Sequence, residues 1–213
     1  MTDPRTRWKT ERLQASAYDF AVNHRAIAKP LARLLWSYDI DELWRSIAQI
    51  PPDATILDVP CGGGLTFKTL RAPKHYVAAD LSPTMLARAR KNAHRHNATV
   101  TLVQADITKL PFPDATFDTC VTYNGLHCLP DPASALRELA RVLRPGGVLR
   151  GTTLIRGTGK LHDTFLTLGR RTSVFGPTAT LADLRTHLLT AGLTTPTLTR
   201  SGAVAAFTAV RPE

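Results

Sequence analysis

Apolar and polar positions alternate with two different periods along this chain. Short apolar runs of strand length recur through the middle of the sequence, and segments with apolar residues at helical spacing separate them. Two more strands are expected at the end, as a hairpin around Ser201 and Gly202. The other predicted strands cover residues 54–59, 75–80, 100–106, 117–124 and 147–155.

Helix signals fill the intervals between these strands. Ser82 is a suitable N-cap and Pro83 a suitable first helical residue, so a helix is predicted from there. Strands that alternate with helices indicate the α/β class, with a doubly wound, mostly parallel sheet and an antiparallel C-terminal edge. Further helices are predicted in residues 16–36 and 39–50, from residue 65 to 71, and in 132–143 and 180–191.

The length of 213 residues suits a single domain. We expect residues 1–50 to form an N-terminal helical cap, and residues 156–178 to form an irregular substrate lid. No apolar run approaches the roughly 20 residues that a membrane span needs, and the N-terminus lacks an apolar signal core. The sequence therefore predicts a cytoplasmic protein with no membrane partner.

The net charge and the cysteines do not select one function. A net charge of +10 favours a polyanionic partner such as nucleic acid, yet the basic residues are scattered and also suit a solvated surface. Three cysteines without a CxxC pair indicate neither a disulfide framework nor a zinc site, and small apolar filling explains them.

The most informative stretch is TILDVPCGGGLTF, residues 55–67, where a strand ends in Asp58 and three glycines follow. A glycine turn between a first strand and a helix marks the ligand crevice of a doubly wound sheet. A phosphate-binding loop needs Gly-Lys-Ser/Thr, and a dinucleotide loop needs GxGxxG; neither spacing is present. Asp58 would also repel a pyrophosphate.

A cationic ligand fits this loop better. S-adenosylmethionine carries a sulfonium and an ammonium, and Asp58 suits that positive end. Asp80 ends the second strand, where a carboxylate can accept hydrogen bonds from ribose hydroxyls, and Asp106 ends the third, near an expected adenine amino group. Each acid alone could be a surface charge or a helix cap, but together they favour this cofactor.

The chain resembles the class I S-adenosylmethionine-dependent methyltransferases, particularly the small type 11 group. The stretches that carry the resemblance span about residues 54–155 and are ILDVPCGGGLTF, VAADLSPTMLARAR, VQADITKLPFPDATFD, NGLHCLPDP and LARVLRPGGVLRGTT. The resemblance implies a Rossmann-like sheet of seven strands. It also implies cofactor contacts from Asp58, Gly62, Gly64, Asp80, Leu81, Asp106, Ile107 and Asn124.

One position of the loop departs from the family. Pro60 stands where the family usually has glycine, and proline fixes φ and lacks an N–H. We expect the cofactor still to bind, with Pro60 as part of a stiffer loop.

Methyl transfer to a hydroxyl needs an acceptor proton to be removed, and histidine suits that work. His127, after the fourth strand, is the first candidate for a general base, and His162 is the second; either could instead be a packed or exposed histidine. The candidates for contacts with the acceptor are Tyr18, His24, Arg170 and Arg171.

The leading hypothesis is transfer of a methyl group to a hydroxyl of a small molecule, with a sugar, such as a methylated mannoside, or another natural product as acceptor. The Ala, Arg, Thr and Leu bias suggests an actinobacterial genome, where the resembling enzymes act on such molecules. The alternatives are an RNA methyltransferase, which the missing base-specific motif makes less favoured, and a non-catalytic cofactor-binding protein. No metal-ligand cluster is evident, although a divalent ion remains compatible with the sequence, as does a homodimer.

Overall fold

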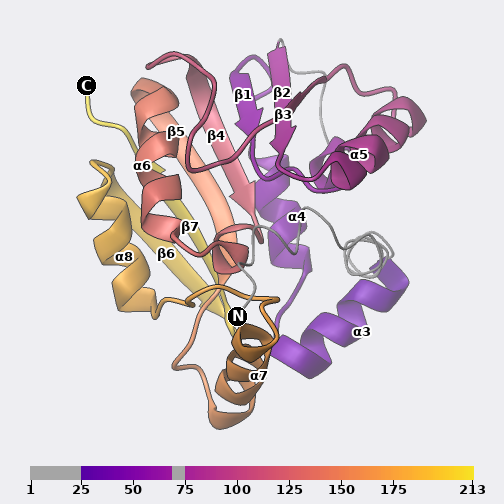
Figure 1. Cartoon of the computed structure of the whole chain (residues 1–213), viewed down its shortest axis with the longest axis vertical. Helices are drawn as coiled ribbons and strands as arrows, with labels where there is room; N and C mark the ends of the chain where they lie inside the picture. Colours follow the sequence, from indigo (N-terminus) through magenta and orange to yellow (C-terminus); the bar gives the residue numbers. More distant parts are fainter. Residues whose placement is uncertain (1–24, 69–74) are drawn as a thin grey trace.

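The structure, a computed structural model, describes residues 25–68 and 75–213. Within these residues seven strands form one sheet in the order β3-β2-β1-β4-β5-β7-β6 (Figure 1). Neighbours among β1 to β5 pair in parallel, whereas β7 pairs antiparallel with β5 and β6, so the predicted sheet and its antiparallel edge are confirmed. The strands are β1 (Thr55–Asp58), β2 (His75–Asp80), β3 (Thr101–Gln104), β4 (Phe117–Tyr123), β5 (Leu143–Leu154), β6 (Thr194–Ser201) and β7 (Val204–Val210).

Helices cover both faces of the sheet because successive strand residues point to opposite sides. Ile56 belongs to a core cluster with α4 and α5, while Leu57 belongs to a cluster with α6 and α8. The helices are α3 (Arg25–Trp36), α4 (Asp41–Ala48), α5 (Pro83–Arg95), α6 (Pro132–Val142), α7 (Lys160–Arg171) and α8 (Leu181–Thr190), with short 3₁₀ turns η1 (Leu65–Lys68) and η2 (Leu126–Cys128).

The predicted start of α5 is present, and a glycine follows the end of α8. Ser82 caps α5 by accepting a hydrogen bond from the Met85 N–H, with Pro83 at the first helical position. Gly192, which follows the C-cap residue of α8, adopts a left-handed φ of 85°. The predicted helix 39–50 is confirmed as α4, whose first turn carries Asp41 and Glu42.

One local prediction was wrong. Residues 156–178 are not irregular, because α7 occupies twelve of them and buries Leu166 against the core. The glycines before α7 adopt left-handed φ values, so they mark the turn into the helix rather than a long loop. The helix predicted from residue 65 to 71 begins as the 3₁₀ helix η1, and residues 69–71 lie outside the described residues.

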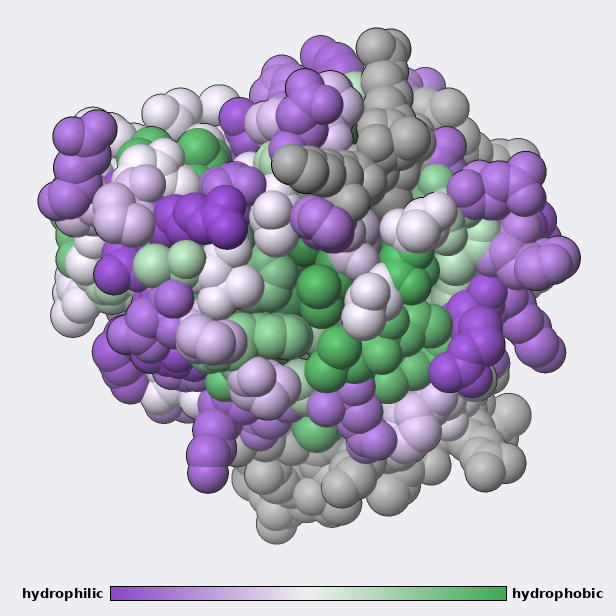
Figure 2. All heavy atoms as spheres, turned by 90° about the horizontal axis from the view of Figure 1, so that it is seen from above, coloured by the Kyte–Doolittle hydropathy of each residue, from purple (hydrophilic) through white to green (hydrophobic). Residues whose placement is uncertain are grey.

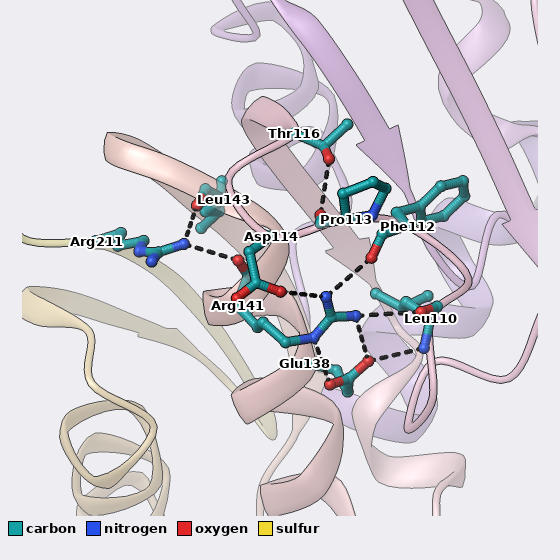
Figure 3. A network of polar contacts seen from close by, with 9 residues as sticks. All are labelled: Leu110, Phe112, Pro113, Asp114, Thr116, Glu138, Arg141, Leu143 and Arg211. Atoms are coloured by element: carbon teal, nitrogen blue, oxygen red, sulfur yellow. Dashed lines mark hydrogen bonds and ion pairs between the residues drawn. The ribbon is translucent and has the colours of Figure 1, made fainter.

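A polar network fixes the connection between β3 and β4 against α6 (Figure 3). Arg141 of α6 donates hydrogen bonds to the carbonyls of Leu110 and Phe112 and to the carboxylates of Asp114 and Glu138. Glu138 in turn accepts the Leu110 N–H at 2.8 Å. The connection that follows Asp106 is therefore held by paired charges.

The surface has both apolar and hydrophilic areas. Seen from above, the molecule shows an apolar area near the centre, and most of the strongly hydrophilic side chains lie around it (Figure 2). In the described residues, every helix is too short or too polar to cross a membrane.

Candidate cofactor site

A cavity lies at the carboxyl ends of the parallel strands, the edge at which doubly wound sheets bind ligands. Its walls come from the ends of β1, β2 and β4 and from the residues after β3. Of the cofactor residues predicted from the sequence, all except Gly64 line it, namely Asp58, Pro60, Gly62, Asp80, Leu81, Asp106, Ile107 and Asn124.

The glycine loop bends where a side chain would be strained. Gly62 has a φ of +53°, and its N–H donates to Asp80 Oδ2 at 2.8 Å, so the loop is tied to the end of β2. Gly64 has a φ of +80°, and a Cβ there would lie 2.2 Å from the Phe67 ring. Gly62 therefore shapes the cavity, while Gly64 allows Phe67 to pack beneath the loop.

Pro60 is accommodated by a second glycine. A Cβ on Gly125, in the loop after β4, would lie 2.4 Å from Cδ of Pro60. The absence of a side chain at Gly125 thus makes room for the proline ring that replaces the usual glycine of the family. Both residues line the cavity.

Asp58 is a buried carboxyl group held by two hydroxyls. Its Oδ2 accepts hydrogen bonds from Tyr76 Oη at 2.8 Å and from Thr66 Oγ1 at 2.7 Å. Burial raises the pKa of Asp58 to about 7, the hydrogen bonds from Thr66 and Tyr76 oppose this rise, and the charge of Asp80 adds to it. Asp58 also faces the titratable groups of Cys61 and Tyr123.

Asp80 is held by backbone amides. It accepts the Ser82 N–H on Oδ1 and the Gly62 N–H on Oδ2, each at 2.8 Å. Burial raises the pKa of Asp80 to about 6 despite these bonds. Two buried carboxyl groups thus line one cavity, and their hydrogen-bond partners in the described residues are neutral. A positive ligand would stabilise the charged form of both.

Asn124 and Asp106 line the cavity, and the side chain of each already accepts hydrogen bonds within the protein. Asn124 has a φ of 55°, a conformation that asparagine tolerates, and its Oδ1 accepts a hydrogen bond from the Thr152 hydroxyl at 3.0 Å. Asp106 Oδ1 accepts hydrogen bonds from the amide and the hydroxyl of Thr108. Their geometry is therefore fixed before any ligand binds.

Sequence reasoning missed several residues of the site. Thr66, Tyr123 and Cys128 line the cavity, and Tyr76 supports Asp58 from behind. Tyr76 lies two residues before the partner of Asp58 in the β1–β2 register, on the same face of the sheet, which only the pairing reveals. Burial raises the pKa of Cys128 to about 12, which agrees with a filling role for this thiol.

His127 is buried against Phe175 and Gly176, outside the cavity lining. Its Nδ1 accepts a hydrogen bond from the Leu154 N–H at 3.2 Å, and its ring packs edge-on against Phe175 with centroids 5.3 Å apart. Burial lowers the pKa of the imidazole to about 4. The ring is therefore neutral near pH 7, with its proton on Nε2.

His162, Arg170 and Arg171 do not line the cavity. His162 on α7 lies near Ser37 and Thr158, with its Nδ1 3.1 Å from Thr158 Oγ1. Arg170 and Arg171 are exposed at the end of α7. Tyr18 and His24 lie outside the described residues. The described residues contain no cluster of three metal-ligating side chains.

The chemistry of the cavity fits S-adenosylmethionine. Among the described residues, Asp58 and Asp80 are hydrogen-bonded to hydroxyls and backbone amides and not to a cationic side chain, which suits a ligand with a sulfonium and an ammonium. Asp80 keeps lone pairs for ribose hydroxyls after accepting two amides. Leu81 and Ile107 supply apolar walls for a flat adenine ring. A phosphate-bearing cofactor would meet the same carboxylates and be repelled.

Comparison with known proteins agrees with this site. Residues 57–150 match the family described as a methyltransferase domain, type 11. The chain is 34% identical over 148 residues to malonyl-[acyl-carrier protein] O-methyltransferase of Serratia marcescens, an alignment that covers 64% of this chain and 56% of that protein. It is 39% identical over 126 residues to demethylmenaquinone methyltransferase of Thermus thermophilus, covering 56% of this chain and 57% of that protein.

The fold is found in solved structures as well. A phosphoethanolamine N-methyltransferase of Haemonchus contortus, solved with S-adenosylhomocysteine, superposes with a TM-score of 0.76 at 16% identity and covers 100% of this chain and 61% of its own. The chain spans just over half the length of the two relatives named above, so their similarity concerns the domain rather than a whole protein. Residues 57–150 therefore match the methyltransferase domain family, and the geometry of the cavity agrees with S-adenosylmethionine as cofactor.

Proposed function

We propose that this protein transfers a methyl group to an oxygen atom of a small molecule. The observation that carries the proposal is the pair of buried carboxyl groups, Asp58 and Asp80, in one cavity at the carboxyl ends of the strands. When bound, S-adenosylmethionine supplies an electrophilic methyl group with a neutral thioether as leaving group. The relative from Serratia marcescens is named as an O-methyltransferase, which supports an oxygen acceptor.

The residues of the chain would act mainly by binding and orienting. Asp58 would face the positive methionine end of the cofactor, with its carboxylate held in place by Tyr76 and Thr66. Asp80 would hold the ribose, and its link to the Gly62 amide keeps the glycine loop against it. In a displacement reaction such alignment supplies much of the rate enhancement.

His127 bears on the kind of acceptor. A group with a pKa of about 4 is a weak base, and the Leu154 amide occupies the ring nitrogen that lacks a proton. A carboxylic acid or a phenol-like hydroxyl ionises without a strong base, so this geometry favours such acidic acceptors. A sugar hydroxyl, the acceptor expected from the sequence, needs His127 to act as general base after its Nδ1 is released.

Calorimetric titration with S-adenosylhomocysteine tests the cofactor part. We expect the wild type to bind and Asp80→Ala to lose about 100-fold or more in affinity, because the variant lacks the acceptor for ribose and for the Gly62 amide. Asp118→Ala is the matched control, since Asp118 also accepts a backbone amide but lies at the other end of the sheet. Absence of binding by folded wild type would contradict the proposal.

An acceptor screen that detects S-adenosylhomocysteine release tests the nature of the acceptor and the role of His127. Carboxylic acids and phenols should react, and their turnover should survive His127→Gln. Turnover confined to sugars and abolished by His127→Gln would instead establish the general base. Turnover confined to amines would contradict an oxygen acceptor.

A further inference from the structure

An apolar surface lies apart from the residues that line the cofactor cavity. Six large apolar side chains are exposed in the described residues, and five of them lie on α3 and α7. Their exposed fractions run from 37% for Leu31 to 75% for Leu34. We call this surface the α3–α7 face, formed by Leu31, Leu34, Leu161, Phe165 and Leu168.

The two helices contact each other. Trp36 at the end of α3 packs against Phe165 of α7, with ring centroids 6.3 Å apart, and lies 6.4 Å from the His162 ring. Leu161, Phe165 and Leu168 follow the i, i+4, i+7 spacing that places side chains on one side of a helix. Figure 1 shows α3 and α7 side by side below the sheet.

Basic residues accompany these apolar side chains. The α3 sequence has three basic residues and no acidic one, and the α7 sequence has three basic residues and one acid, Asp163. Asp163 is engaged, because its Oδ1 accepts the Gly157 N–H at 2.8 Å. Lys29 pairs with Asp41, whereas Arg33, Lys160, Arg170 and Arg171 are exposed.

This combination is typical of helices that lie in the headgroup region of a membrane. Such helices have leucine or phenylalanine on one side and lysine or arginine beside them, and their basic residues attract anionic lipids. Binding hot spots of protein interfaces are instead enriched in tryptophan, tyrosine and arginine, with leucine under-represented. Four of the five apolar residues here are leucines.

We propose that the α3–α7 face docks on the surface of a bilayer that contains anionic lipids. The apolar side chains enter the headgroup boundary, and the basic residues contact the lipid phosphates. The chain lies on the membrane and does not span it, which departs from our expectation of no membrane partner. The proposal does not depend on the nature of the methyl acceptor.

Co-sedimentation with vesicles tests this proposal on the full chain. The protein should sediment with vesicles of equal parts phosphatidylcholine and phosphatidylglycerol, and much less with phosphatidylcholine alone. Leu34→Glu and Leu168→Glu should each weaken binding about tenfold or more, because each places a negative charge in the apolar face. Leu189→Glu is the matched control, since Leu189 is an exposed leucine on α8, outside the face.

Other outcomes would overturn the proposal. Wild type that stays in the supernatant, or Leu34→Glu that binds as well as wild type, excludes docking through this face. Salt-sensitive binding that both glutamate variants retain indicates a purely electrostatic attraction to polyanions such as RNA. A dimer in analytical ultracentrifugation that Leu34→Glu dissociates shows that a second copy of the chain covers the face. Circular dichroism confirms that each variant is folded.

Discussion

Two regions of the molecule hold acidic side chains in opposite ways. At α6, Glu138 meets the guanidinium of Arg141, whose hydrogen bonds lower the pKa of that carboxyl group. At the cavity, Asp58 and Asp80 meet only hydroxyls and backbone amides among the described residues, and burial raises the pKa of both. The first arrangement is complete within the protein, whereas the second leaves negative charge for a ligand to neutralise.

The difference shows how a structural network and a binding site are told apart. Isolated buried carboxyl groups destabilise a fold unless something else in the site compensates for them. The Arg141 network connects two segments and needs no ligand. Substitutions in the first region should therefore change stability, and substitutions in the second should change binding and its dependence on pH.

The largest expected effect is on stability. Arg141→Ala removes the donor to two carbonyls and two carboxylates, and we expect a loss of about 3 kcal/mol in the free energy of unfolding. Urea unfolding measures it. Arg144→Ala is the control, because the Arg144–Asp118 pair is exposed and should contribute less than about 1 kcal/mol. Equal losses in the two variants would contradict the claim that the Arg141 network contributes more to stability than an exposed ion pair.

Asp58→Asn should make stability less dependent on pH. The pKa of Asp58 is about 7 in the folded chain and has the ordinary value of 3.8 when unfolded, so the folded state holds an extra proton between these values. Stability should therefore fall as pH rises through this window, by about 2 to 3 kcal/mol between pH 5 and 8 from this group. Unfolding measured without cofactor at pH 5 and at pH 8 should therefore show a smaller loss of stability in Asp58→Asn than in the wild type. An unchanged pH dependence would contradict the raised pKa.

The smallest expected effect belongs to the hydroxyl behind Asp58. Tyr76→Phe removes a hydrogen bond that favours the ionised carboxyl, so the pKa of Asp58 should rise and S-adenosylmethionine affinity at pH 7 should fall about fivefold. The deficit should shrink at pH 8 and above. Tyr38→Phe is the control, because Tyr38 is a buried tyrosine outside the cavity lining. A deficit that does not vary with pH would point to lost packing instead.

Local signals predicted much of the fold. β2 has the predicted bounds, His75 and Asp80, and the Ser82-Pro83 start of α5 is present. Residues 156–178 were predicted to be irregular because Gly157 and Gly159 suggest a loop. The helix after these glycines depends on the burial of Leu166. Long-range packing decided that segment, and a single sequence does not display it.

The site residues that stand at the ends of strands could be predicted from the sequence. Contacts between residues on different strands could not. Asp58, Gly62 and Asp80 stand at strand ends, which the sequence marks. The contact of Tyr76 with Asp58 depends on the β1–β2 register. Likewise, His127 meets the Leu154 amide because β5 lies beside β4, so its tautomer and its low basicity appear only in the structure.

The measurement that tests the account most directly is the number of protons released when S-adenosylmethionine binds. Calorimetry near pH 6.5, in two buffers with different ionisation enthalpies, gives that number. Because Asp58 is largely protonated at this pH and must ionise to face a cation, we predict release of about half a proton or more, and about tenfold higher affinity at pH 8 than at pH 6. Binding with no proton release and no change in affinity with pH would contradict the claim that these carboxyl groups await a positive ligand.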